Sequence, residues 1–166
     1  KDHVKYLKMA ADNGDLYSLR DYSDLLLDGN EVVLINKKEA LRYMKMYADK
    51  ADGRSKYYFA RDLFNGESFP MNKIEAAHYY QLSAEEGYVD SMIDYADILY
   101  NGNGLPANNE ESLKYYKMAA DKGDVHSMFM SSFLLDNYDE NKNESKEYYN
   151  MAIKSENSDS IYEFAI

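Results

Sequence analysis

The residues best suited to chemistry are arginines and aromatics that recur at a spacing of about 36 residues. Three of the chain's four arginines occupy such positions, close to tyrosines. A guanidinium can clamp a carboxylate through two hydrogen bonds and can also stack on an aromatic ring. The pattern predicts a groove in which arginines and tyrosines grip an acidic or terminal carboxylate of a peptide, while other side chains hold its apolar part. The candidate partner-binding residues are Tyr17, Arg20, Arg54, Tyr57, Tyr58, Arg61, Ile93, Phe129, Met130 and Phe133.

A purely structural role for these residues remains open at this point. Arg61 shares its recurring position with Asp24 and Asp97, so it can belong to a ladder of charges between repeats. Arg20 can pair with Asp24 along one helix, because residues four apart are neighbours on a helix surface. The apolar candidates near residue 130 can be covered by a following repeat or by a further C-terminal segment.

Other kinds of site have little support. His3, His78 and His126 lie far apart and lack a histidine or cysteine partner at metal-ligand spacing. The abundant carboxylates are spread along helix faces that we expect to be solvated. The segment Gly102–Gly104 joins two helices and lacks the lysine of a phosphate-binding loop. We therefore expect no catalytic residues, no metal and no cofactor, and a protein that is not an enzyme.

Composition excludes several classes of protein. Hydrophobic residues make up 45% of the 166, with 2 Pro and 8 Gly, so the chain can bury a core. No stretch approaches the roughly 18 unbroken apolar residues of a membrane span, so we expect no direct membrane insertion. The net charge of −11 argues against nucleic acid as a partner, because its phosphates are neutralised by Lys and Arg. The absence of Cys excludes a disulfide scaffold, and the compartment cannot be read from the sequence.

The elements that must position these residues belong to a repeat. Its clearest copy is YYKMAADKGD at Tyr115–Asp124, and successive anchors are separated by 37, 36, 36 and 33 residues. Such a period is typical of a supersecondary unit. Two turn positions in each period indicate two helices, here called helix A and helix B. The anchors are the pairs Tyr6/Leu7, Tyr43/Met44, Tyr79/Tyr80, Tyr115/Tyr116 and Tyr148/Tyr149.

Helix A is clearest in the third full unit, where a stripe of small and apolar residues recurs at helical spacing. This stripe consists of Ser91, Met92, Tyr95, Ala96, Ile98 and Leu99. The stripe of the second unit contains two charged residues, Lys56 and Asp62. Gly102 is expected to end helix A in the left-handed conformation. An apolar loop residue is then expected to plug the core, namely Val32 or Val33, Phe69 and Leu105 in successive units.

Helix B is expected to begin at an asparagine followed three residues later by a glutamate. In this capping box the asparagine accepts a backbone N–H of the first turn, and the glutamate reaches back to the N–H of the cap residue. The four pairs are Asn36/Glu39, Asn72/Glu75, Asn108/Glu111 and Asn141/Glu144. The fourth unit lacks both glycines and the plug, so we expect a different turn between its helices.

These features divide the chain into units. Residues 1–14 form the second helix of a truncated repeat, and four repeats follow at 15–51, 52–87, 88–123 and 124–156. Residues 157–166 are assigned to the first helix of another truncated repeat, after a turn at Glu156. We expect further repeats at both ends.

The whole chain resembles Sel-one-like repeats, which are relatives of tetratricopeptide repeats. The resemblance is carried by the glycines of the loop, the cap, a small residue, the aromatic pair and the motif K-x-A-A-x-x-G. In the third unit these residues are Gly102, Gly104, Leu105, Asn108, Ser112, Tyr115, Tyr116, Lys117, Ala119, Ala120 and Gly123. The resemblance implies an all-α, right-handed α/α superhelical solenoid of helix-turn-helix repeats, with helix A lining its concave face.

The resemblance also implies a protein–protein interaction scaffold or adaptor that binds a partner peptide or domain through helix A. Two alternatives stay open. The chain can be a structural element of a large cytoskeletal or membrane-associated assembly. It can also be a regulatory repeat segment of a larger enzyme such as a protein kinase.

Overall fold

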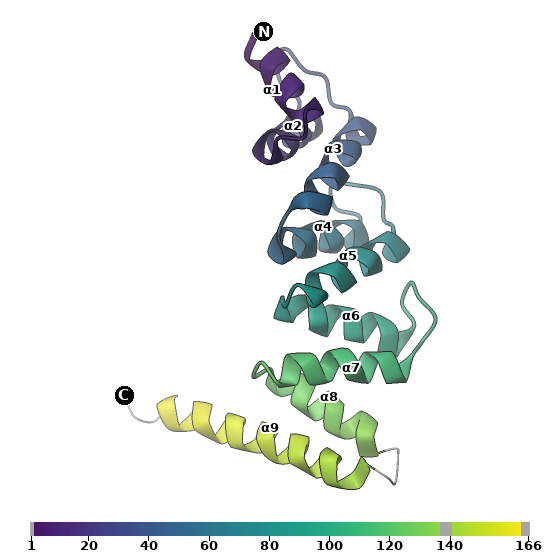
Figure 1. Cartoon of the computed structure of the whole chain (residues 1–166), viewed down its shortest axis with the longest axis vertical. Helices are drawn as coiled ribbons and strands as arrows, with labels where there is room; N and C mark the ends of the chain where they lie inside the picture. The colour runs from purple at the N-terminus through teal and green to yellow at the C-terminus, as the bar shows by residue number, and fades with distance from the viewer. Residues whose placement is uncertain (1, 137–140, 164–166) are drawn as a thin grey trace. The chain divides into compact units, whose positions relative to one another are not determined.

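The computed structural model describes the backbone of residues 2–136 and 141–163, and side chains as far as Ser155. These residues form nine α-helices and no strand (Figure 1). The chain divides into two compact units, Lys1–Glu86 and Gly87–Ile166. The predicted all-α fold of paired helices is confirmed.

The first unit contains α1 to α5. Helices α2 and α3 pack against each other as the A and B helices of one repeat, and α4 and α5 do the same in the next. Helix α1 packs on α2, and α3 also contacts α4. The bounds are α1 (Asp2–Asp12), α2 (Leu16–Asp28), α3 (Lys37–Lys50), α4 (Gly53–Asn65) and α5 (Lys73–Glu85).

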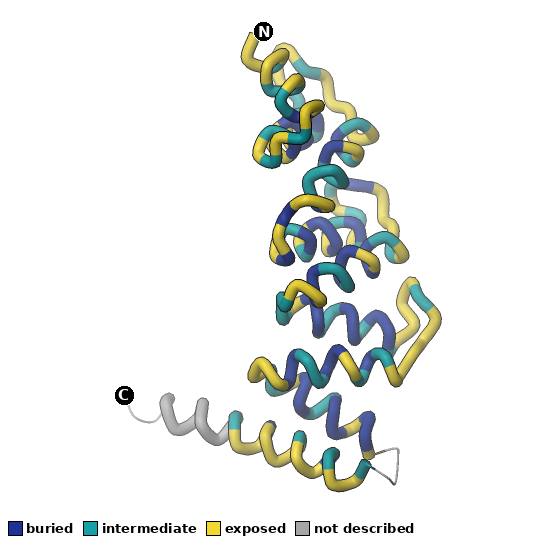
Figure 2. Tube along the Cα trace, in the orientation of Figure 1, coloured by how far each residue is buried: buried dark blue, intermediate teal, exposed yellow. Residues whose placement is uncertain are grey.

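The second unit contains α6 to α9, in which each helix packs on the next. The bounds are α6 (Val89–Asn101), α7 (Asn109–Ala120), α8 (Val125–Asp136) and α9 (Lys142–Glu163). All six residues of the expected stripe on α6 are buried, and buried positions alternate with exposed ones along the helices (Figure 2). The turn expected between the helices of the fourth repeat involves residues 137–140 and lies outside the described residues.

Glycine ends helix A where it was expected. Gly66 and Gly102 adopt the left-handed conformation, with φ of 73° and 68°, and each donates its N–H to the carbonyl four residues earlier. The turn expected at Glu156 is absent, because α9 continues to Glu163. Glutamate favours a helix and resists the left-handed conformation that terminates one. The assignment of residues 157–166 to a further repeat stays a prediction.

Of the two hydrogen bonds predicted at the starts of α3, α5 and α7, the structure contains the one accepted by the asparagine side chain and lacks the one accepted by the glutamate. The asparagine side chains of Asn36, Asn72 and Asn108 accept the N–H of the glutamate three residues on, at 3.1, 3.2 and 3.1 Å. The second half of the predicted box is wrong, because each cap N–H instead donates to a helix A carbonyl, that of Leu26, Leu63 or Leu99. Carbonyls at the end of a helix lack intrahelical donors, so the returning loop satisfies them. The pair Asn141/Glu144 stays a prediction.

The glutamates of these caps accept side-chain N–H groups. Each takes one from the asparagine of its own cap, at distances of 3.0 to 3.3 Å. Glu75 also pairs with Lys45 at 2.6 Å, and Glu144 pairs with Lys117 at 2.7 Å. Both lysines lie on the helix B of the preceding repeat, so the glutamate connects consecutive repeats.

The two charged residues in the helix A stripe of α4 have structural partners. Lys56 is buried, and its ammonium donates to the Ala51 carbonyl and pairs with Glu86 at 2.6 Å. Asp62 accepts the backbone N–H of Ser68 at 2.6 Å and so holds the loop that follows α4. Of the plugs, Phe69 is buried and Leu105 is half-buried. In the first loop Val33 is half-buried and Val32 is exposed, so Val33 is the plug.

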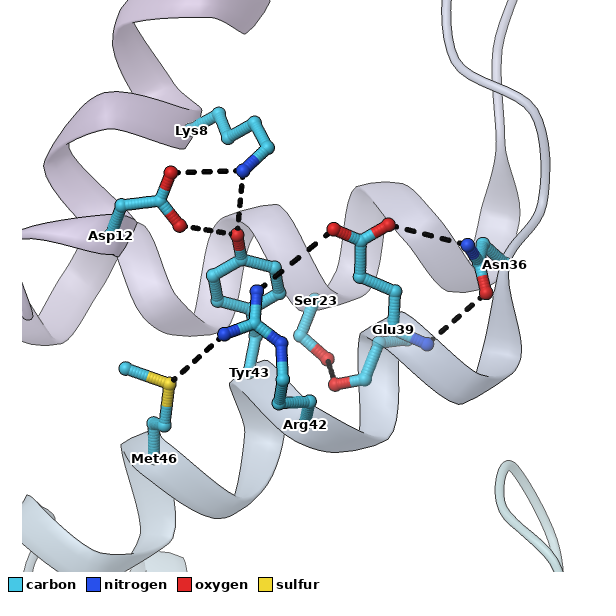
Figure 3. Close-up of polar contacts among 9 residues, drawn as sticks. Lys8, Asp12, Ser23, Asn36, Glu39, Arg42, Tyr43 and Met46 are labelled. Atoms are coloured by element: carbon cyan, nitrogen blue, oxygen red, sulfur yellow. Dashed lines mark hydrogen bonds and ion pairs between the residues drawn. The ribbon is translucent and has the colours of Figure 1, made fainter.

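Tyrosines of helix B also connect consecutive repeats. The Tyr43 hydroxyl donates to Asp12 at 2.5 Å and accepts from the Lys8 ammonium at 3.0 Å (Figure 3). Tyr79 donates to Asp49 at 2.8 Å, and Tyr148 donates to Asp121 at 3.3 Å. In these three repeats the first tyrosine of the anchor pair therefore both packs between helices and forms a polar contact.

Candidate functional site

The ten candidate residues are divided between the two units. Tyr17 and Arg20 lie on α2, and Arg54, Tyr57, Tyr58 and Arg61 lie on α4. The second unit holds Ile93 on α6 and Phe129, Met130 and Phe133 on α8. The predicted site therefore comprises one surface in each unit.

On α4 the arginines and tyrosines form one cluster. The guanidinium carbons of Arg54 and Arg61 lie 5.7 and 5.0 Å from the centre of the Tyr58 ring, and Arg61 lies 5.8 Å from that of Tyr57. Arg54, Tyr58 and Arg61 share a helix face because they are four and three residues apart. Both guanidinium groups thus stack within the distance at which a cation is attracted to a ring face. We call Arg54, Tyr57, Tyr58 and Arg61 the α4 cluster.

The start of α4 is held firmly against α5. Asp52 caps the helix by accepting the N–H of Ser55 at 2.9 Å. Gly53 follows, where a Cβ atom would lie 3.2 Å from Cβ of Glu86 and 3.3 Å from the Ser83 carbonyl oxygen. A glycine therefore suits this close approach, because a Cβ atom here would make tight contacts with α5. These contacts and the Lys56–Glu86 pair fix the position of the α4 cluster.

The charge-ladder interpretation of Arg61 is not supported. Within the part of the chain that the structure describes, Arg61 forms no ion pair and contacts the two tyrosine rings. Arg20 lies 3.8 Å from Asp21, its sequence neighbour, and forms no ion pair with Asp24. The N–H groups of a guanidinium lie in its own plane and point outward, so a guanidinium over a ring can still bind a carboxylate at its edge.

Beside the α4 cluster lies a cavity of about 270 Å³ formed by α2, α3, α4 and the loop after α4. We call it the α2–α4 cavity. Its polar lining comes from Arg20, Asp24, Ser55, Asp62 and Ser68. Its apolar and aromatic lining comes from Leu27, Met44, Tyr47, Tyr58, Phe59 and Phe69. Tyr58 belongs both to this lining and to the α4 cluster, so the two features adjoin.

Asp24 is the electrostatically distinctive residue of this cavity. Partial withdrawal from water raises the pKa of its carboxyl above the usual value, and Asp21 and Asp28 act in the same direction. Arg20 opposes this shift. From the sequence, Asp24 was assigned to a position that recurs in each repeat and Asp62 to the helix A stripe. Neither residue was predicted to belong to a binding site. No sequence signal marks the cavity, because three helices and a loop are needed to form it.

In the second unit, Phe129, Met130 and Phe133 line a hollow of about 520 Å³ between α8 and α9. The rings of Phe129 and Tyr149 are 6.0 Å apart. Phe133 and Tyr149 remain 56% and 51% exposed, which makes this surface apolar and accessible. Ile93 is half-buried on α6 and does not line this hollow. In the first unit, Tyr17 is 74% exposed and does not line the α2–α4 cavity.

The described residues contain neither a candidate metal site nor a candidate membrane span. No group of three or more His, Cys, Asp or Glu side chains among them is arranged to hold a metal ion. No helix in the described ranges combines the length and apolar character needed to cross a bilayer.

Comparisons with known proteins identify the repeat. The family model described as Sel1 repeat matches residues 4–15, 16–52, 57–88 and 89–124. No curated protein sequence matches the chain. The fold is similar to a Sel1 repeat protein from Oxalobacter formigenes, with a TM-score of 0.80 and 13% identity over 92% of this chain and 45% of that one.

A second similar structure is c5321, a protective antigen of uropathogenic Escherichia coli with an SLR fold. Its TM-score is 0.59, with 21% identity over 91% of this chain and 33% of that one. The chain thus spans less than half the length of these two proteins. At these identities the likeness shows the fold, an all-α helical repeat of the solenoid class.

Proposed function

Because the chain belongs to the Sel1 repeat family, whose members are typically protein-interaction scaffolds, we propose that it binds a partner protein through helix A side chains. The binding surface of the first unit is the α4 cluster with Arg20 beside it. The ligand is a peptide that carries an acidic or terminal carboxylate. In the second unit the hollow formed by Phe129, Met130 and Phe133 contacts an apolar part of the partner.

The observation that carries this proposal is the stacking of Arg54 and Arg61 over Tyr58. Arginine and tyrosine dominate the binding energy of many interfaces, because they combine contact area with directional hydrogen bonds. Ring stacking limits the conformations of a long side chain before the partner arrives, which reduces the entropy lost on binding. Arg54, Tyr58 and Arg61 are exposed on a helix that is itself fixed by the contacts of Gly53 and Lys56, so the geometry of the cluster is preorganised.

The test compares peptides with and without a carboxylate. A library of random peptides with free C-termini is selected against the protein, and the enriched peptides are then made as free acids and as C-terminal amides. Fluorescence anisotropy gives both affinities. We expect the double substitution Arg54→Gln and Arg61→Gln to weaken binding of the acids by about 10- to 100-fold, which corresponds to charge-assisted hydrogen bonds of about 1.5–3 kcal/mol.

Arg42→Gln supplies the matched control. Arg42 is the remaining arginine of the sequence, and its guanidinium stacks on Tyr43 at 4.2 Å, but it lies on helix B. The control should bind the acids like the unmodified protein. Two results would contradict the proposal. One is unchanged binding by peptides in which the C-terminus is amidated and every Asp and Glu is replaced by Asn or Gln. The other is an equal loss of affinity in the control and the double variant.

A further inference from the structure

We infer that the α2–α4 cavity binds a basic side chain, an arginine, of the partner peptide. The inference rests on the proposed function, since it supplies a second contact for a peptide held at the α4 cluster. It also assigns Arg20 to the cavity and not to the carboxylate-binding surface, because Arg20 lines this cavity together with two carboxylates.

The charges of the lining favour a cation. Asp24 and Asp62 outnumber Arg20, which leaves one net negative charge. Among the described residues the Asp24 carboxylate has no hydrogen bond or ion pair. Asp62 uses Oδ1 for the N–H of Ser68, and no described residue forms a hydrogen bond or ion pair with its Oδ2. A guanidinium presents several donors in one plane and can supply both carboxylates with hydrogen bonds.

The walls of the cavity suit the stem and the face of an arginine. Tyr47, Tyr58 and Phe69 supply aromatic surface, on which a guanidinium can stack. The volume of about 270 Å³ lies just below the range of about 300–1,000 Å³ usual for pockets that enclose a whole small molecule. One long side chain is therefore a better match than a larger free ligand.

An acidic side chain would be disfavoured in the same place. It would meet Asp24 and Asp62, and Asp21 and Asp28 add to the negative potential at Asp24. The arginines of the α4 cluster, by contrast, are stacked over Tyr58, which borders the cavity. The two adjoining features thus select a peptide in which an arginine is close to a carboxylate.

The first test uses a probe that has no carboxylate, so it does not depend on the α4 cluster. N-acetylarginine N-methylamide is titrated into the isotopically labelled protein at constant ionic strength, and amide NMR shifts are followed. The neutral isostere N-acetylcitrulline N-methylamide is the reference. We expect the arginine probe to bind about tenfold more tightly, with the largest shifts at Ser55, Asp62 and Ser68.

Substitutions then separate the cavity from the general negative charge of the protein. Asp24→Asn should abolish the preference for arginine over citrulline, whereas Asp28→Asn, which removes the same charge from the same helix outside the lining, should retain it. The inference is overturned if both probes bind alike, if neither binds, or if the two variants lose the preference equally.

The two proposals fail in different ways. Loss of the carboxylate dependence in Arg54→Gln/Arg61→Gln, with no difference between the arginine and citrulline probes in any variant, would support the α4 cluster and reject the cavity. The opposite pattern would support a cation site in the cavity and reject carboxylate recognition at the cluster. Thermal unfolding of each variant verifies that these differences come from folded protein.

Discussion

Lys56 is a buried cation in a position where other repeats place an apolar residue. Its ammonium is satisfied by the Ala51 carbonyl and by Glu86, at the end of α5. A buried ammonium is tolerated as long as it keeps its polar partners. Truncating the lysine side chain removes those partners' contacts and also the packing of its aliphatic stem. The residue thus links the start of the second repeat to its end.

We predict that Lys56→Ala lowers the free energy of unfolding by about 1–3 kcal/mol, because the Ala51 carbonyl loses its donor and the stem leaves a gap. Urea denaturation measures the change. Lys38→Ala, on an exposed face of α3, is the control and should stay within about 0.5 kcal/mol of the unmodified protein. Equal effects of the two substitutions would show that the buried contacts contribute nothing.

Tyr148 provides a prediction on pH. Burial raises its pKa to about 12, and Asp121 acts in the same direction. The neutral phenol is favoured in the folded state, so its contribution to stability is complete below the unfolded pKa of about 10 and is lost as pH rises towards 12. Urea unfolding from pH 8 to pH 12 should therefore show a smaller decline for Tyr148→Phe than for the unmodified protein. Parallel declines would disprove this role.

Helix B depends on its asparagine cap and on the loop that returns to helix A. In the third repeat Asn108 accepts the Glu111 N–H through its side chain and donates its own N–H to Leu99. The side-chain bond satisfies an N–H at the start of α7, and the main-chain bond satisfies a carbonyl at the end of α6. One residue thus completes both helices of a repeat.

Asn108→Ala should destabilise the protein by about 0.5–2 kcal/mol, because only the side-chain bond is removed. The neighbouring substitution Asn109→Ala changes the same residue type at the first helical position of α7 and should have a small effect. Thermal unfolding by circular dichroism compares the two variants. A larger loss in Asn109→Ala would contradict the cap.

The molecule as a whole carries a net charge of −11, with a sequence pI of about 4.7. Repulsion among like charges opposes the compact state, and salt screens it over a Debye length of about 10 Å at 0.1 M. The ion pairs described above are partly exposed, except at Lys56, and such pairs contribute about 0–1 kcal/mol each. Repulsion should therefore dominate the salt dependence.

We expect the urea midpoint of unfolding to rise between 0.02 and 0.5 M NaCl, about the range over which the Debye length falls from roughly 20 to 4 Å. Urea is used because guanidinium is itself a salt. Sucrose, which stabilises through exclusion from the surface, serves as an uncharged comparison. A midpoint that falls with NaCl would mean that attractive pairs outweigh the net repulsion.

Local sequence pattern alone was enough to predict much of the secondary structure of this protein. The period, the helix A stripe of Ser91 to Leu99, the glycine ends at Gly66 and Gly102 and the asparagine caps all depend on residues within one helix or one turn. Periodic burial and backbone conformation are encoded at that range. The exception at Glu156 follows the same rule, since the position lacks the glycine that would end the helix.

Only the tertiary structure decided which side chains meet. The partners of Lys56 and of the cap N–H groups, and the cavity that joins Asp24 to Asp62, involve residues of different helices or loops. A repeat pattern gives every copy the same expected geometry, whereas packing depends on the side chains that differ between copies. Those differing residues form the surfaces that we propose for binding. Their arrangement therefore could not be predicted from the repeat pattern and became visible only in the tertiary structure.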